Sequence, residues 1–150
     1  MWEFGQNDVK RDSGSKLVRL GLASTIRVGQ SFGGIVLNSE AELVASPADL
    51  DIVLQHGVGG VNCSWNRIDE VPLHRLGQRK NHRKLPLLVA ANSVNYGKPF
   101  KMNTAEATAA TLRLVGLTNQ AEALLEPFSW GPEFFRLNEE AFRRYAVAAD

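Results

Sequence analysis

The chain has 150 residues and a mass of 16.5 kDa, which fits one domain that buries its own core. Its 44% hydrophobic and 22% charged residues are ordinary for a globular protein, and they exclude a disordered tail, a collagen repeat and a coiled-coil rod. The net charge of +1 gives no overall attraction to nucleic acid, and no apolar run reaches the ~18 residues that span a bilayer. A single cysteine, Cys63, excludes an internal disulfide framework, and no leader-like segment follows Met1, so we expect a reducing intracellular compartment.

The first part of the chain predicts short strands and one helix. Residues 1–6 begin with large side chains and are typical of a strand. Residues 16–23 carry apolar side chains at helical spacing, and Ser13 is suited to cap that helix. Two short apolar runs, at 35–37 and 43–45, predict buried strands.

A second helix is predicted after Ser46-Pro47-Ala48-Asp49, which combines a capping hydroxyl, a proline at the first helical position and an acid in the first turn. This helix is expected to stop at Gly57, and residues 60–63 read as the next strand. Residues 85–91 form the longest apolar run and predict the most buried strand.

The last third of the chain predicts helices alone. They cover residues 104–115, ending at Gly116; residues 120–125, closed by Pro127; and residues 133–146, with an apolar stripe along one side. Strands alternating with helices indicate an α/β domain around a mostly parallel sheet. We expect one compact unit, with an α/β region at 1–92 and a mainly helical region at 93–150 packed on it.

Charge is unevenly distributed along the chain. Residues 71–105 carry seven basic residues and no acidic one, and the densest part is the segment 74–84 (HRLGQRKNHRK), called here the basic block. Such a block attracts phosphates, although a solvated loop would have the same composition.

Common catalytic and cofactor motifs are absent from the sequence. No Gly-rich nucleotide fingerprint opens a helix, and His56, His74 and His82 lack metal-ligand spacing with Cys63. Three polar segments are nevertheless unusual for pure scaffold: residues 8–14, residues 62–66 after a predicted strand, and the long loop 90–100. Together they suggest one pocket.

Those segments carry a family resemblance. In order along the chain, the matching motifs are Asp8-x-Lys10-x-x-Ser13-Gly14, Phe32-Gly33-Gly34-Ile35, Ser46-Pro47-Ala48-Asp49, Cys63-Ser64-Trp65-Asn66, Leu85-Pro86-x-Leu88-Val89-Ala90-Ala91-Asn92, Val94-Asn95-Tyr96-Gly97-Lys98-Pro99, Glu106-Ala107, Trp130-Gly131 and Leu137-Asn138. The chain resembles the small-subunit (18S-type) ribosomal RNA aminocarboxypropyltransferases, and its N-terminal half looks more like eukaryotic than archaeal members.

The resemblance implies a fold of the SPOUT class, with a mostly parallel sheet flanked by helices and a knotted helical C-terminal half. It implies transfer of the 3-amino-3-carboxypropyl group of S-adenosylmethionine, as co-substrate and without a metal, to a (N1-methyl)pseudouridine of small-subunit rRNA, releasing methylthioadenosine. It further implies a monomer that acts on rRNA or a pre-ribosomal particle in ribosome biogenesis, away from membranes, in the cytoplasm and also the nucleus.

The resemblance also implies roles for individual residues. Trp65 and Ile68 would enclose the donor's methyl group, and Ser13 and Thr104 would hold its carboxylate. The positions implied around the adenosine are Leu37, Ser39, Val61, Leu85, Phe100, Met102 and Ala107. The residues implied to face RNA are Lys10, Arg11, Arg75, Arg79, Lys80, Arg83 and Lys84.

The family pattern identifies no catalytic residue here. Many relatives have an acid before Cys63-Ser64-Trp65, whereas this chain has Asn62, which cannot accept a proton as a base. Two other readings therefore stay open: an RNA-binding ribosome-assembly factor without catalysis, and a SPOUT-type RNA methyltransferase that would release S-adenosylhomocysteine. The sequence leaves the modified rRNA position and the need for prior base methylation undetermined.

Overall fold

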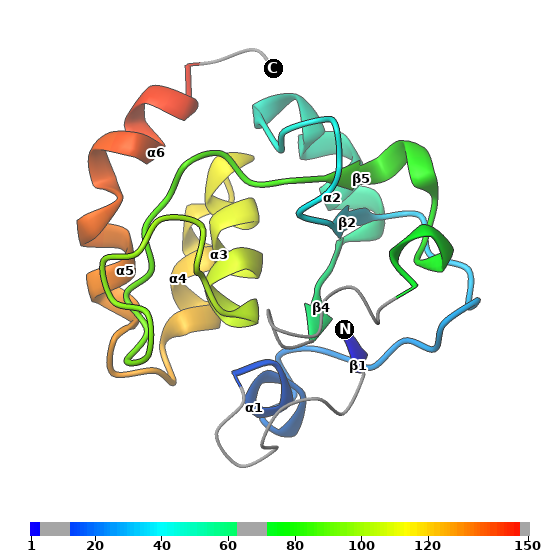
Figure 1. The fold of residues 1–150 in the computed structure, drawn as a ribbon, viewed down its shortest axis with the longest axis horizontal. Coiled ribbons are helices and arrows are strands. Elements are labelled where there is room, and N and C mark those ends of the chain that lie inside the picture. Colours follow the sequence, from blue (N-terminus) through cyan, green and yellow to red (C-terminus); the bar gives the residue numbers. More distant parts are fainter. Residues whose placement is uncertain (4–12, 63–71, 148–150) are drawn as a thin grey trace.

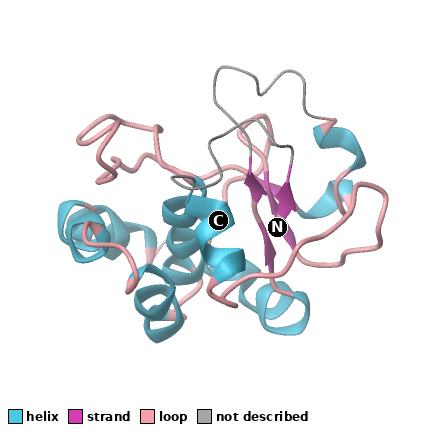
Figure 2. Cartoon of the chain, turned by 90° about the horizontal axis from the view of Figure 1, so that it is seen from below, coloured by secondary structure: helices cyan, strands magenta, loops and turns pink. Residues whose placement is uncertain are grey.

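The computed structural model describes residues 1–3, 13–62 and 72–147, and its strands form two small parallel sheets. In the first, β1 (Trp2–Glu3) pairs with β4 (Val61–Asn62), with Trp2 opposite Val61. In the second, β2 (Ile35–Leu37) lies between β3 (Val58–Gly59) and β5 (His82–Arg83). Figure 2 shows the strands side by side with helices on either side of them. The predicted α/β class with a parallel sheet is confirmed.

Four helices, α3 to α6, gather on one side of the molecule, and α2 lies with the β2 sheet on the other. Figure 1 shows α1 apart from both groups, at the bottom of the view near β1. The α-helices are α1 (Ser13–Arg19), α2 (Leu50–His56), α3 (Thr104–Leu114), α4 (Thr118–Leu125), α5 (Gly131–Leu137) and α6 (Glu139–Tyr145). Short 3₁₀ turns are η1 (Pro47–Asp49), η3 (Leu73–Arg75) and η4 (Arg79–Asn81).

Local sequence signals account for the start and the end of α2. The Ser46 hydroxyl accepts from the Ala48 amide, and Asp49 accepts from the Ser46 amide, so a capping box opens η1 and leads into α2. Gly57 then ends α2 with φ of 88°, a backbone conformation that favours glycine. The prediction of a helix from Pro47 to Gly57 is confirmed, as are the strand at 35–37 and the helices near 104–115 and 120–125.

The core bridges the two predicted regions of the chain. Its largest cluster surrounds α3, where Ala105, Ala109 and Leu114 are at most 3% exposed. The same cluster includes Leu17 of α1, Leu88 of the segment between β5 and α3, Phe134 of α5 and Phe142 of α6. Smaller clusters lie around Trp2 and Val36, and around Ile35 and Val53. The helical part thus packs against residues from the first 92.

The segment 85–91 is not the strand that its apolar run predicted. Leu87 is 53% exposed, and Val89 makes a single antiparallel bridge to Pro99. The backbone of this segment pairs with the following loop instead, because the amide of Phe100 donates to Leu88 (3.0 Å) and that of Ala90 donates to Lys98 (3.0 Å). The third strand of the sheet comes from His82–Arg83, inside the basic block.

Three other predicted boundaries are corrected. At residues 43–45, Val44 makes only one isolated bridge, to Lys84. The first helix runs from Ser13 to Arg19 rather than over 16–23, so Ser13 is its first residue and not its cap. The strand expected over 60–63 is β4 at Val61–Asn62, and Cys63, like residues 4–6 of the first predicted strand, lies outside the described residues.

The final helix is broken in two at Asn138, whose backbone has φ of −105° and ψ of 12°. Its buried side-chain amide donates to the carbonyls of Val89 (2.9 Å) and Phe134 (2.8 Å), and its oxygen accepts from the Val89 amide (2.8 Å). The interruption gives the 85–91 segment the backbone partner that a sheet strand would otherwise supply.

We predict that Asn138→Ala lowers the free energy of unfolding by about 2–3 kcal/mol, because it leaves the half-buried Val89 amide and carbonyl without this partner. Urea unfolding should show a lower midpoint with an unchanged m-value. Asn119→Ala, at an exposed position of α4, is the matched control and should change stability by less than about 0.5 kcal/mol. Equal effects of the two substitutions would contradict the prediction.

Candidate functional site

The chain leaves β2 and β5 at the same edge of the sheet, because the two strands are parallel. The amide of Asn38 donates to the carbonyl of Arg83 (2.9 Å), which brings the two exits together. Leu37 is the last residue of β2, Ser39 follows that strand, and Leu85 follows β5; Leu37 and Leu85 are half-buried and Ser39 is exposed. This is the edge at which parallel α/β sheets commonly bind ligands.

The N-termini of α1 and α3 meet each other. The amide of Ala105, in the first turn of α3, donates to the hydroxyl of Ser13 at the start of α1 (3.2 Å). Ser13 is buried and Thr104 half-buried. Ser13 and Ala105 lie 92 positions apart in sequence and are neighbours in the fold, so the partial positive charge of two helix N-termini is concentrated there. This arrangement suits a carboxylate.

The segment between residues 92 and 104 connects the two parts of the candidate site. Phe100 has a positive φ of 60°, which is unusual for a large side chain, and it is 53% exposed. Met102 is buried in the main core, and Asn103 caps α3 by accepting from the Glu106 amide (2.8 Å). The segment thus places an exposed strained residue two positions before a buried anchor.

One carboxylate holds this segment at both ends. Glu106 is completely buried, and its two oxygens accept from the amides of Ala91 (2.6 Å), Asn92 (3.1 Å) and Asn103 (3.0 Å) and from the side chain of Asn92 (2.6 Å). In the sequence, Glu106 stands out only as part of a matching motif, without a role of its own. The capping spacing Asn103-x-x-Glu106 was the signal available in the sequence.

The loop tip is tied to the helical side. The hydroxyl of Tyr96 donates to Glu133 of α5 (3.1 Å), and Glu133 is also paired with Arg136. Hydrogen bonding from Arg136, with a smaller contribution from Tyr96, holds the pKa of the Glu133 carboxyl below its usual value. Glu133 therefore stays an ionised acceptor for Tyr96 well into the acidic range.

The remaining predicted donor-site positions are distributed as follows. Val61 is half-buried in β4 and Ala107 is half-buried in α3. A Cβ added at Gly60, beside Val61, would lie 3.1 Å from the Thr108 hydroxyl, so β4 begins close to α3. Trp65 and Ile68 lie outside the described residues.

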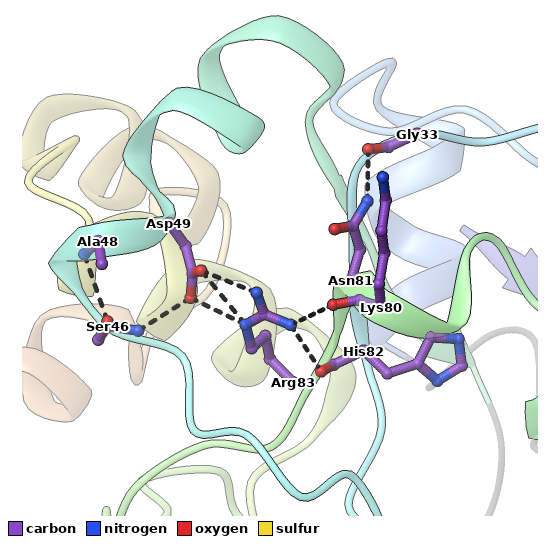
Figure 3. A network of polar contacts seen from close by, with 8 residues as sticks. All are labelled: Gly33, Ser46, Ala48, Asp49, Lys80, Asn81, His82 and Arg83. Carbon is purple, nitrogen blue, oxygen red and sulfur yellow. Dashed lines mark hydrogen bonds and ion pairs between the residues drawn. The ribbon is translucent and has the colours of Figure 1, made fainter. Parts of the chain in front are cut away.

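Arg83 is separated from the other predicted RNA-facing residues. It is 9% exposed, and its guanidinium forms an ion pair with the buried Asp49 (3.2 Å) and donates to the carbonyls of Lys80 (2.8 Å) and His82 (3.0 Å). Figure 3 shows the side chain pointing inward toward Asp49. We therefore withdraw Arg83 from the RNA-facing set, because its charge is already used inside the protein.

The other described members of that set are accessible. Arg75, Arg79, Lys80 and Lys84 are all exposed, and they lie on or next to η3, η4 and β5. Lys10 and Arg11 lie outside the described residues. The basic block is thus an exposed charged surface anchored by buried residues, and Asn81 contributes to the anchor by donating to the Gly33 carbonyl (3.0 Å).

A buried histidine joins the basic block to the exit of β2. Nε2 of His82 lies 2.6 Å from the Leu76 carbonyl, which can only accept, so Nε2 carries the proton. Nδ1 then accepts from the side-chain amide of Asn38 (3.0 Å). The same chain of hydrogen bonds therefore connects the exposed basic block to the residues that follow β2.

Within the described ranges, no helix is long and apolar enough to cross a membrane. The same residues contain no group of three or more His, Cys, Asp or Glu side chains arranged to hold a metal ion.

Comparisons with known proteins agree on one family. A family model described as "Ribosome biogenesis protein, C-terminal" matches residues 35–150. The 18S rRNA aminocarboxypropyltransferase of Saccharomyces cerevisiae is 49% identical over 150 residues, covering all of this chain and 48% of the relative. The 16S rRNA aminocarboxypropyltransferase of Halobacterium salinarum is 43% identical over 147 residues, covering 97% of this chain and 85% of the relative.

The fold has a close counterpart among solved structures. The SAM-dependent rRNA:acp-transferase Tsr3 from Vulcanisaeta distributa superposes with a TM-score of 0.86 at 33% identity, covering 97% of this chain and 80% of that one. The present chain spans about half the length of the yeast relative and most of the archaeal ones.

Proposed function

Since the chain belongs to the family of small-subunit rRNA aminocarboxypropyltransferases, we propose that it transfers the 3-amino-3-carboxypropyl group of S-adenosylmethionine to small-subunit rRNA. The observation that carries the proposal is the meeting of Ser13 with the first turn of α3, which brings two helix N-termini together. In this proposal the two helix N-termini hold the donor's carboxylate, and the half-buried Leu37 and Leu85 hold its adenine.

The donor's sulfonium supplies the chemistry, because each of its three carbons is open to attack. Selection among them is a matter of position: a protein that fixes the carboxylate and the adenine leaves one carbon facing the acceptor. In this proposal Ser13 and Thr104 bind the carboxylate, and Leu37, Leu85 and Met102 bracket the adenine. Methylthioadenosine is then the leaving group.

The acceptor would be approached from the basic block. Arg75, Arg79, Lys80 and Lys84 are exposed, and contacts of this kind to phosphates position RNA without reading bases. We propose a pseudouridine, methylated at N1 or unmodified, as the acceptor base; such a base must leave its stack to reach the donor. The proposed partner is small-subunit rRNA or the pre-ribosomal particle.

We extend the proposal to three properties of the whole chain. The fold is of the SPOUT class with a knotted helical C-terminal half, a topology compatible with a small parallel sheet followed by four packed helices. The chain acts as a monomer, which sedimentation would test. It works in the cytoplasm and the nucleus, which imaging of a tagged chain would test.

The deciding experiment incubates the purified chain with small-subunit rRNA lacking the modification. S-adenosylmethionine is supplied in two forms, labelled in the carboxypropyl chain or in the methyl group. We expect RNA labelling from the first form only, with methylthioadenosine as by-product. RNA labelling from the methyl form, with S-adenosylhomocysteine released, would identify a methyltransferase. RNA binding without donor binding would identify an assembly factor without catalysis.

A further inference from the structure

We infer that Glu106 is a positioning residue for the donor: its buried carboxylate fixes the conformation of residues 92–104, the segment that lines the donor site. The inference rests on the proposed function and adds a residue to which neither the family resemblance nor the comparisons assign a role. Its basis is that the Glu106 side chain is completely buried. The carboxylate accepts hydrogen bonds from the Ala91 amide and the Asn92 side chain, which belong to the loop before α3.

The geometry requires a carboxylate at this position. Oε2 accepts from the amides of Ala91 and Asn92, and Oε1 accepts from the Asn103 amide and the Asn92 side chain. All four partners donate, and an ionised carboxylate only accepts, so every group is satisfied. A glutamine would place an NH₂ group against two of these donors.

The contacts fix both ends of the segment. Ala91 and Asn92 mark its entry, and Asn103 its exit into α3, so one side chain determines the span between them. Asn92 extends the clamp, since its side-chain oxygen accepts from the amides of Val94 (3.1 Å) and Asn95 (3.0 Å). The buried side chains of Glu106 and Asn92 therefore hold the start of the exposed loop tip.

This clamp accounts for the strained residue in the segment. A positive φ at a non-glycine residue is energetically unfavourable and persists only where the surroundings impose it. Phe100 is such a residue and is more than half exposed, so its own side chain does not impose the conformation. The fixed ends at Asn92 and Asn103, with the Phe100 amide bonded to Leu88, impose it instead. Thr104, at the carboxylate end of the site, immediately follows the clamped residue Asn103.

The test compares Glu106→Gln with the wild-type chain by two measurements. Hydrogen exchange without donor reports the order of residues 91–104, and titration calorimetry reports the Kd for S-adenosylmethionine. We expect faster exchange confined to that segment and a Kd raised by about tenfold or more, because two buried donors lose their acceptor. Leu114→Ala, a buried change at the far end of α3, is the control; it should lower Tm without altering the Kd at a temperature where both variants are folded.

A second variant distinguishes positioning from general loss of stability. In Asn92→Asp/Glu106→Gln the glutamine amide donates to the new carboxylate, so the central contact re-forms with its donor and acceptor exchanged. We expect partial recovery of the Kd relative to Glu106→Gln alone.

Three results would overturn the inference: exchange at 91–104 unchanged by Glu106→Gln, faster exchange with an unchanged Kd, or a Kd raised as much by Leu114→Ala. If the wild-type chain itself binds no S-adenosylmethionine, the proposed function fails first and this inference fails with it. The wild-type titration therefore separates the two failures.

Discussion

Replacing Arg83 with methionine is expected to lower the free energy of unfolding by about 3–5 kcal/mol, because it leaves the Asp49 carboxylate buried without its cation. Asp49 also accepts from the Ser46 amide at the start of η1, so the change reaches the capping box that opens α2. Chemical denaturation measures the loss, and the m-value checks that unfolding stays two-state.

The same substitution tests whether Arg83 contacts RNA. Measured at a temperature where the variant is folded, Arg83→Met should bind small-subunit rRNA as the wild-type chain does. Arg79→Met is the matched control: its side chain is exposed, so it should leave stability unchanged and weaken binding with a shallower dependence on salt. A stable Arg83→Met variant with reduced RNA affinity would return Arg83 to the RNA-facing surface.

The ion pair can be examined further by removing both charges. In Asp49→Asn/Arg83→Met the buried carboxylate is gone, so we expect a smaller loss of stability than the single substitutions predict when added. A double variant whose loss equals the sum would mean that the two residues act independently, contrary to the 3.2 Å contact between them.

Elements whose structure is decided by neighbouring residues were predictable from the sequence. The Ser46-Pro47-Ala48-Asp49 signal gave the helix start with its capping box, and Gly57 gave its end. The strand at Ile35–Leu37 and the helix starting at Thr104 followed in the same way from local pattern. In the two helices the stabilising contacts lie within a few residues along the chain, whereas β2 pairs with distant strands and was recognised by its apolar run alone.

Elements whose local pattern disagrees with the structure that their distant partners impose were not predictable. Residues 85–91 are apolar enough for a strand, but their backbone bonds to the loop at 97–100 and to the side chain of Asn138. Conversely, His82–Arg83 lies in a run of charges and still forms a strand, because β2 offers it an edge and Asp49 neutralises the guanidinium. Composition carries no information about either partner.

The candidate site shows the same division. The polar character of residues 8–14, 62–66 and 90–100 predicted one pocket, which stays a prediction, and the family pattern named Ser13 and Thr104. That their helices begin next to each other is a property of the fold, since 91 residues separate them in sequence. The role of Glu106 was hidden for the same reason, because its partners at Ala91 and Asn92 precede it by a long loop.

Loss of the hydroxyls at Ser13 and Thr104 should weaken binding of S-adenosylmethionine far more than binding of methylthioadenosine. The two ligands share the adenosine and the sulfur, but only the first carries the carboxylate that the two helix N-termini are proposed to hold. For Ser13→Ala/Thr104→Val we expect the Kd for S-adenosylmethionine to rise by about a hundredfold, since a hydrogen bond to a charged group contributes about 1.5–3 kcal/mol. The Kd for methylthioadenosine should change less than about threefold.

The comparison between ligands separates a lost carboxylate contact from a disturbed fold. Ser13 also accepts from the Ala105 amide, so its removal affects the packing of α1 against α3 as well. Such a disturbance would shift the residues proposed to contact the adenine and weaken the binding of both ligands. Loss of a carboxylate contact would weaken the binding of S-adenosylmethionine alone. Thr111→Val is the matched control, because Thr111 lies further along α3 than Thr104. Its buried hydroxyl donates to the Ala107 carbonyl (3.0 Å), so the control also removes a hydrogen-bonding hydroxyl from the same helix. Equal loss for both ligands would assign Ser13 and Thr104 to the fold, and no loss for either would place the carboxylate elsewhere.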